Sequence, residues 1–327
     1  MTDKENIKIL GKKYVRLILD KISKIKKRVI NNYDKIFNKV EKEDIIKKLR
    51  ELGIKEGNTL YVHSSMSSFG YVTGGQDTVI DSLLEIVGKE GNIIMPTFNY
   101  INSKEPRLNL FDPEKTPCET GKIAEAFRLR KSSKRSIHPL ASVAAIGPMS
   151  AYLTAGHENT KTPFAEDSPY GKMINDNTYI LNLGTEHNSF MHYIQEKVNF
   201  PNLFLNGLFR FRYKKNNKIE NSLFKIHHPL SSTYLVKQNK KTKKLDTHEF
   251  YVNLYREIKL KEKGITKTTK IGKANVRLLK MKGLIKYSIP YIKENILQHK
   301  KQYNSLISTW NKKHKYYFRE LKKENEK

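Results

Sequence analysis

The sequence predicts an α/β protein with a mixed, partly parallel sheet flanked by helices. From residue 42 onward, short β-rich runs bounded by glycine, proline or polar residues alternate with amphipathic helical segments. This alternation favours helices that connect neighbouring, mostly parallel strands. The chain has 327 residues, which is enough to bury a sizeable core. We expect an added helix before this region and basic helices after it.

Residues 6–32 form the predicted N-terminal helix. The apolar positions follow steps of three and four residues, which is the spacing of one helical face. They are Ile7, Leu10, Tyr14, Ile18, Ile22 and Ile25. The opposite face is rich in lysine. Two interpretations stay open: the helix packs on the domain or on a second subunit in a homodimer, or it lies on a membrane surface.

The central region supplies the predicted sheet. We expect strands at 58–63, 91–96 and 178–184, and helices at 42–53, 77–88 and 121–130. Residues 202–250 are rich in Lys and Asn with interleaved aromatics, which favours hairpins or long loops over the core. Residues 249–263 are predicted helical, and a strand or turn with a terminal helix follows. The expected layout is therefore a basic extension at 1–40, an α/β domain at 41–295 and a charged helical tail at 296–327.

The formal charge of +29 is concentrated at the two ends. Residues 1–40 hold 12 Lys/Arg against 4 Asp/Glu, residues 41–199 hold 18 against 20, and residues 200–327 hold 32 against 9. Solvated helix faces would account for this pattern, and so would attraction to anionic partners such as sugar nucleotides, acidic lipids or RNA. A specific nucleic-acid interface is not expected, because the region richest in motifs is almost neutral.

The composition also indicates the cellular compartment in which the protein is expected. Cys118 is the only cysteine, so no intrachain disulfide forms and nothing favours an oxidising compartment. No run approaches the ~20 apolar residues of a membrane span, and the start lacks a signal-peptide core. We expect a cytoplasmic protein whose basic ends would contact the inner membrane surface.

The first segment that could carry chemistry is residues 61–88. A strand ends at His63, a Ser/Gly-rich loop follows, and a helix begins near Gln76. Small side chains, exposed backbone N–H groups and a helix N-terminus favour an anion. The segment lacks both the Walker ending and the Rossmann glycine spacing. A plain strand-to-helix turn remains the alternative.

The second segment is "RSIHPLASVAAIG" at 135–147. Arg135 and Ser136 are candidates for contact with a phosphate or a pantetheine amide. Proline restricts the residue before it to extended conformations, so His138 lies in a rigid turn, where a structural role is more common than a catalytic one.

The third segment is "GTEHNSFMHYIQE" at 184–196. His187 and His192 are five residues apart, which places them on different faces of a helix, whereas helical metal pairs use a spacing of four. His192 and Glu196 have that spacing, but zinc needs three or four convergent ligands. One imidazole with one carboxylate favours proton transfer, with a buried structural histidine as the alternative. His227 and His228 give no spacing argument. A serine hydrolase is a rival, but the Gly-x-Ser-x-Gly elbow is missing.

These segments, taken together and in this order, resemble the aminoglycoside 3-N-acetyltransferase family. The matching stretches are "VHSSMSSFGYVTGGQDTVIDSLLE", "GNIIMPTFNY", "FDPEKTPCETGKIAEAFR", "RSIHPLASVAAIGP", "GHENTKTPFAEDSPYGKM", "YILNLGTEHNSFMHYIQE" and "KIGKANVRLL". The resemblance implies the fold of that family and an acetyl-CoA-dependent N-acetyltransferase activity of the kind that confers antibiotic resistance, with no metal.

The resemblance also implies residue roles. The acyl-CoA site would be lined by Ser64, Ser65, Ser67, Ser68, Gly70, Gly74 and Gly75, with Arg135, Ser136 and Ser142 near the cofactor. The family pattern Asn-Thr-x-x-His-x-x-x-Glu falls on Asn188, Ser189, His192 and Glu196, with serine in place of threonine. His192 would then be the general base with Glu196 near it. Such a base would deprotonate the amine as it attacks the thioester directly, and the serine loop would stabilise the oxyanion.

The acceptor half departs from the family pattern. Residues 200–245, on the expected acceptor side, contain only Glu220 as an acid beside eleven Lys/Arg. A polycationic aminoglycoside would be repelled, so we expect a less basic or anionic amino sugar, such as a nucleotide-linked or surface-polysaccharide sugar. The alternatives are a true aminoglycoside antibiotic acetyltransferase and a non-enzymatic RNA- or membrane-binding protein on the same fold.

Overall fold

The computed structural model describes residues 38–99, 110–201, 203–205, 207–227 and 259–301, and the backbone of 234–238 and 245–249. It also describes scattered helical residues from 15 to 36 and at 304, 305 and 308. Residues 7, 10, 14 and 228 and most of the expected tail after 296 lie outside the described residues.

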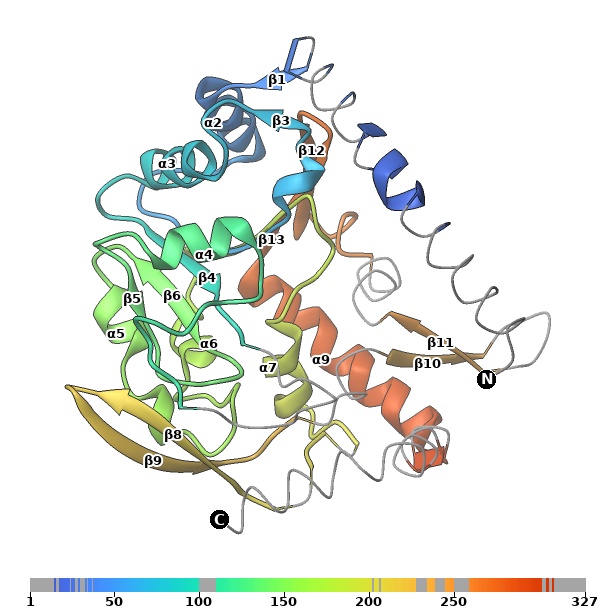
Figure 1. Ribbon diagram of the computed structural model, residues 1–327. Helices are drawn as coiled ribbons and strands as arrows, with labels where there is room; N and C mark the ends of the chain where they lie inside the picture. The colour runs from blue at the N-terminus through green and yellow to red at the C-terminus, as the bar shows by residue number, and fades with distance from the viewer. Residues whose placement is uncertain are drawn as a thin grey trace, which may run out of the picture.

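A seven-stranded sheet organises the chain, with strand order β12-β13-β7-β2-β4-β6-β5 (Figure 1). Its strands are β2 (Thr59–Ser64), β4 (Asn92–Pro96), β5 (Lys134–Arg135), β6 (Val143–Ile146), β7 (Thr178–Leu183), β12 (Thr266–Ile271) and β13 (Ala274–Lys280). Only β7, β2 and β4 run parallel, and the strands outside them pair antiparallel. The predicted mixed, partly parallel sheet is thus confirmed.

Helices cover both faces of the sheet (Figure 1). One face packs under α2 (Lys42–Leu52), α3 (Gln76–Val87) and α4 (Lys122–Arg128). The other packs under α5 (Ser150–Thr154), α6 (Pro169–Lys172), α7 (Met191–Lys197) and α9 (Met281–Gln298). In β2, Leu60 and Val62 face the first core and Tyr61 faces the second, because side chains alternate along a strand.

Two smaller pairs of strands lie outside the main sheet. Near the N-terminus, β1 (Lys39–Val40) pairs parallel with β3 (Tyr71–Val72). A separate pair is formed by β10 (Tyr234–Gln238) and β11 (Leu245–Glu249). Short 3-10 turns, η1 (Met66–Ser68) and η2 (His157–Asn159), connect the larger elements.

A long hairpin forms a third apolar cluster. Strands β8 (Phe209–Lys215) and β9 (Lys218–Phe224) pair antiparallel, and Phe209, Phe211 and Phe224 are buried on its inner side. Phe111 bridges to Tyr213 and joins this cluster. The expected hairpin within 202–250 is confirmed, and it reaches the core through aromatic side chains.

The strands and helices predicted for the central region are confirmed to within two residues at each end, because their patterns are local. The helix predicted for 249–263 is wrong where the structure describes it, since Glu249 ends β11 and residues 259–264 form turns. The sequence also did not predict β6, which follows the turn expected at His138. Helix α9 continues across the expected boundary at 295 to Gln298.

Candidate active site

Three loops meet at one edge of the sheet. The parallel strands β2, β4 and β7 end at Ser64, Pro96 and Leu183, so their carboxyl ends lie side by side. Ligands of open α/β sheets bind beyond this edge, because connecting loops from neighbouring strands converge there. The loop after β2 is the serine loop, residues 64–75, and the loop after β7 leads to His192.

His192 lies in the first turn of α7 and has a defined tautomer. Its Nδ1 is 2.9 Å from the side-chain oxygen Oε1 of Gln195. An amide oxygen only accepts, so Nδ1 carries the proton and Nε2 is left as the basic nitrogen. Burial lowers the pKa of His192 to about 3, the nearby His227 lowers it further, and the hydrogen bond to Gln195 opposes both. The imidazole is therefore neutral at physiological pH.

Glu196 hydrogen-bonds to three groups other than His192. Its Oε1 lies 2.7 Å from Nε2 of His227 and accepts from the backbone N–H of Phe164 at 3.1 Å. Its Oε2 accepts from the hydroxyl of Thr162 at 2.6 Å. The sequence analysis placed Glu196 near His192 without assigning it a partner; in the structure Gln195, one residue earlier, hydrogen-bonds to His192, and Glu196 hydrogen-bonds to His227.

His227 is a site residue that the sequence did not single out. Its ring packs against those of Phe164 and Phe204, with centroids 5.0 Å away in each case, and lies 5.3 Å edge-on from the ring of His192. Its Nδ1 is buried and has no hydrogen-bond partner among the described residues. The segment after β9 had no periodicity that could place it here, because only the fold brings residues 31 apart together.

His63 is a second site residue that the sequence did not single out. It is the last buried residue of strand β2. Its Nε2 accepts from the backbone N–H of Ser189 at 3.3 Å, and the hydroxyl of Ser189 lies 2.6 Å from that of Tyr61. Burial lowers the pKa of His63 to about 3, and His187 and His192 contribute. The position at the end of a strand was the available signal, since strand ends face the ligand edge.

The serine loop is tied to the loop after β7. Ser68 donates its hydroxyl hydrogen to the carbonyl of Gly184 at 2.7 Å, and its Oγ lies 2.8 Å from that of Ser65. Gly184 has a φ of +71°, and a Cβ built there would lie 2.5 Å from Cβ of Ser68. Only glycine fits this contact.

The expected cofactor-binding residues of this loop differ in exposure. Ser67 and Gly74 are exposed, whereas Ser64, Ser65, Ser68, Gly70 and Gly75 are half-buried. Gly75 precedes the first turn of α3, where Asp77 already accepts from Arg130 at 2.8 Å. The exposed part of the loop, with its hydroxyls and backbone N–H groups, is the part open to a ligand.

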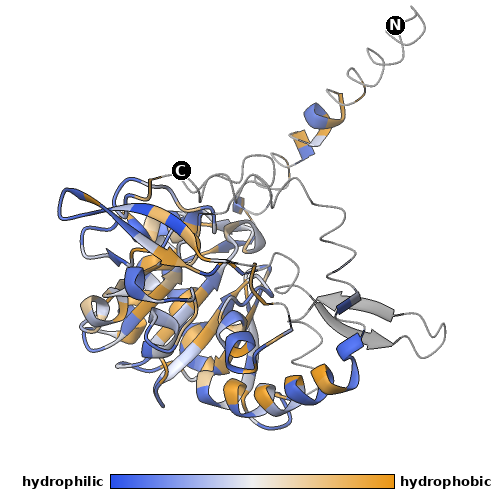
Figure 2. Ribbon diagram, turned by 90° about the horizontal axis from the view of Figure 1, so that it is seen from below, coloured by the Kyte–Doolittle hydropathy of each residue, from blue (hydrophilic) through white to orange (hydrophobic). Residues whose placement is uncertain are grey.

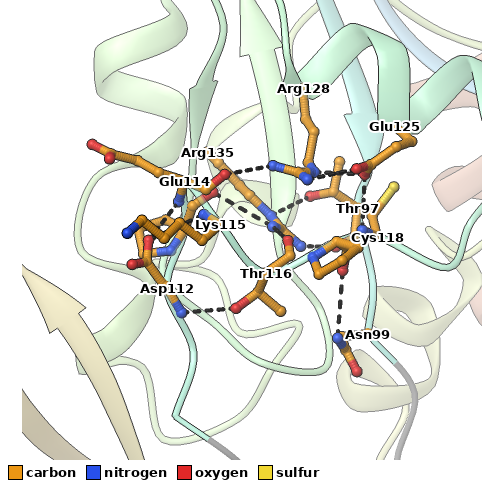
Figure 3. Close-up of polar contacts among 12 residues, drawn as sticks. Thr97, Asn99, Asp112, Glu114, Lys115, Thr116, Cys118, Glu125, Arg128 and Arg135 are labelled. Carbon is orange, nitrogen blue, oxygen red and sulfur yellow. Dashed lines mark hydrogen bonds and ion pairs between the residues drawn. The ribbon is translucent and has the colours of Figure 1, made fainter.

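In the second expected cofactor stretch, the side chain of Arg135 is held by backbone carbonyls (Figure 3). The Arg135 guanidinium donates to the carbonyls of Thr97 and Thr116 and lies 4.8 Å from the ring of Phe111. Burial lowers its pKa to about 10. Figure 3 shows the guanidinium connecting the loop at 112–116 to Thr97, which directly follows β4.

Ser136 and Ser142, also expected near the cofactor, lie inside the protein. Both are fully buried, so in this structure neither has surface for a ligand. The hydroxyl of Ser142 donates to the carbonyl of Thr97 at 2.7 Å, and that of Ser136 lies 2.9 Å from Nδ1 of His157. Their hydroxyls are used within the fold, which sequence spacing alone does not reveal.

Acidic side chains beside the β8–β9 hairpin and after β7 are paired with cations. Glu158 pairs with Lys215 at 2.7 Å, Asp112 with Lys214 at 3.6 Å, and Glu186 with Arg277. Among the described residues no cluster of three or more His, Cys, Asp or Glu could hold a metal ion, and no helix is long and apolar enough to cross a membrane.

The sequence model of the family described as aminoglycoside 3-N-acetyltransferase matches residues 61–293, which include every site residue above. The chain belongs to this family. The acetyltransferase-like protein YokD of Bacillus subtilis, "SPbeta prophage-derived aminoglycoside N(3')-acetyltransferase-like protein", is 32% identical over 168 residues, 45% of this chain and 61% of that protein. Aminoglycoside N(3)-acetyltransferase VII of Streptomyces paromomycinus is 29% identical over 180 residues, 50% of this chain and 62% of that protein.

Solved structures of aminoglycoside 3-N-acetyltransferases share the fold. The crystal structure of AAC(3)-Xa has a TM-score of 0.68 at 21% identity, covering 83% of this chain and 98% of that one. The binary structure of AAC-IIIb with CoASH has a TM-score of 0.66 at 18% identity, covering 78% and 97%. By sequence, the chain spans only about three fifths of the length of the curated family members it matches.

Proposed function

We propose that the protein is an acetyl-CoA-dependent N-acetyltransferase in which His192 is the general base. One observation carries the proposal: the neutral imidazole of His192, held by Gln195, keeps its basic Nε2 in the tautomer that proton abstraction needs. The serine loop at the same sheet edge is connected to the His192 loop through Ser68 and Gly184. A base and a set of hydroxyl and N–H donors therefore share one edge.

The proposed reaction is direct acyl transfer. The amine nitrogen attacks the thioester carbonyl carbon, and a tetrahedral adduct forms whose oxyanion accepts hydrogen bonds from the serine loop. The adduct nitrogen then carries a positive charge and gives its proton to Nε2 of His192. The C–S bond breaks, and CoA leaves as a thiolate. Because burial lowers the pKa of His192 to about 3, the imidazole is unprotonated throughout the physiological range and its Nε2 is free to accept this proton.

His227 and Glu196 are proposed as positioning residues. The Glu196 carboxylate fixes the ring of His227, and that ring packs edge-on against His192. Phe164 closes the other side of His192, with ring centroids 4.7 Å apart. This packing limits the orientation of the base, and small errors in orientation cost large factors in rate.

For the acceptor, we propose the amine of an aminoglycoside-class amino sugar. The family assignment and the names of the relatives support this class over the nucleotide-linked sugar expected from the basic acceptor side. One observation favours the less basic acceptor as a second candidate. Glu158 and Asp112 near the hairpin are bound to lysines, and Glu220 accepts from the hydroxyl of Tyr213 at 3.0 Å. Compensated acids bind a polycation weakly.

Release of free thiol from acetyl-CoA tests the proposal across a panel of kanamycin-type aminoglycosides and nucleotide-linked amino sugars. We expect amine-dependent release, and a loss of about a hundredfold or more in kcat for His192→Gln. His299→Gln is the matched control, because it removes an imidazole at the remote end of α9. Thiol release without any amine would identify a thioesterase, and wild-type turnover by His192→Gln would remove His192 as the base.

A further inference from the structure

A helical stretch outside the matched family region carries an exposed apolar face. The structure describes seven large apolar side chains on it that are between 54% and 68% exposed. They are Val15, Ile18, Leu19, Ile22, Ile25, Val29 and Ile36. Figure 2 shows this stretch standing away from the body, with apolar and polar residues side by side along it. Side chains of this size are rarely gathered on a surface without a partner.

The seven side chains form one face. At 3.6 residues per turn they fall within an arc of about 120°, which is the width of an apolar stripe that buries itself against something. On that helical wheel exposed Lys35 and Asp20 lie on the side opposite the arc, and exposed Lys21 lies about 40° outside one of its edges. Exposed Lys26 falls inside the arc, where its long stem reaches past apolar neighbours to place the ammonium outside.

The stretch is attached to the body next to the proposed site. Lys35 Nζ lies 6.0 Å from the centroid of the Tyr71 ring, and β1 then pairs with β3. The serine loop contains β3, so the helix is joined to the protein beside the loop that the proposed function assigns to the oxyanion. None of the seven apolar residues belongs to the clusters that form the described core.

Charge decides between the partners for this face. Residues 15–36 hold seven Lys/Arg against two Asp. Two copies packed through their apolar arcs would place Lys26 of each copy, which lies inside the arc, at the interface, and the fourteen cations and four acids of the pair would leave its net positive charge without an anionic partner. An anionic bilayer complements both sides of the helix, since the apolar arc enters the acyl boundary and the cations meet negative headgroups. We propose that residues 15–36 bind the protein to the surface of an anionic phospholipid bilayer.

Flotation of the full-length protein with vesicles tests this inference. One set of vesicles contains phosphatidylcholine alone and the other phosphatidylcholine and phosphatidylserine in equal parts. We expect binding to the anionic vesicles only, weakened by added salt because surface charges are screened. Replacing Lys21, Lys24, Lys26 and Lys27 with glutamine should weaken it about tenfold or more, given the contribution of each cation near the surface.

Matched variants separate this surface from the general charge of the protein. Glutamine at Lys47, Lys55, Lys89 and Lys131, four exposed lysines of the body, removes the same charge and should leave vesicle binding within about twofold. Ile18→Asp with Ile22→Asp should abolish binding, whereas Leu129→Asp, at a 63% exposed apolar residue of the body, should not. Tm and thiol release should be unchanged in all of these variants.

Three outcomes would overturn the inference. The first is equal weakening by the two lysine sets, which would place the binding in the general charge. The second is absence of flotation with anionic vesicles at low salt. The third is a molecular mass by light scattering that halves in Ile18→Asp with Ile22→Asp while vesicles fail to bind, which would assign the face to a second copy of this chain.

Discussion

Replacing Gln195 with leucine removes the one acceptor that sets the tautomer of His192. The side chain of Gln195 is fully buried, and its Oε1 lies 2.9 Å from Nδ1 of His192. Without it, the Nδ1–H is left unpaired in a desolvated place, at a cost of about 1–3 kcal/mol. The ring can escape this cost by moving its proton to Nε2, and that nitrogen is then no longer basic. The penalty corresponds to a loss of about five- to 150-fold in kcat.

Gln195→Glu is the informative partner variant. A carboxylate keeps an acceptor at Nδ1 and adds a negative charge, which raises the pKa of His192. We expect kcat to be largely retained, and the acid limb of the profile of kcat against pH to move to higher pH. The assay is thiol release at saturating acetyl-CoA and amine from pH 5 to pH 9. If Gln195→Leu keeps the wild-type kcat and pH profile, the tautomer argument fails, whatever its effect on KM.

The remaining predictions concern the scaffold of the site. Gly184→Ala should lower the free energy of unfolding by about 1–3 kcal/mol and lower kcat, because φ is +71° and Ser68 occupies the space that a Cβ needs. Gly57→Ala, with a similar φ and open space around it, should cost less and leave kcat unchanged. Urea unfolding and thiol release measure the two effects. Arg135→Lys should lower the free energy of unfolding by about 2 kcal/mol and leave the KM for acetyl-CoA unchanged, because the Arg135 guanidinium donates to backbone carbonyls. A raised KM for acetyl-CoA would instead support a role of Arg135 in cofactor binding. Burial lowers the pKa of His157 to about 3, so below the unfolded pKa of 6.5 unfolding takes up a proton. The free energy of unfolding should therefore fall toward pH 3, by up to about 1.4 kcal/mol per pH unit for each such histidine. Urea midpoints from pH 7 to pH 4 should fall less steeply in His157→Gln than in the wild type, and an unchanged slope would contradict this.

Family membership favours an aminoglycoside-class acceptor over an anionic amino sugar. The basic charge of the acceptor side still favours the less basic sugar. The basic hairpin and its paired acids are properties of this chain, whereas the names of the relatives describe other proteins. A direct competition between an aminoglycoside and an anionic amino sugar would therefore report on the hairpin itself. The amine panel distinguishes the two without any further variant.

Local sequence patterns determined the positions of the central strands and helices. The apolar runs of β2, β4 and β7 and the amphipathic helices α2, α3 and α4 were predictable because a strand or helix with one buried face repeats its apolar residues at a fixed period. The order of the motifs identified the family, and the spacing of four between His192 and Glu196 placed both on one short helix. Spacing also excluded a helical metal pair in that stretch.

Only the tertiary structure decided which polar group meets which. A spacing of four residues permits a contact but does not require it, and Glu196 pairs with His227 because the segment after β9 packs there. His63 reaches Ser189 across 126 residues of sequence, and Ser136 and Ser142 are hidden because neighbouring elements cover them. Burial requires each polar atom to find a partner within reach, and that reach is set by packing rather than by position in the chain.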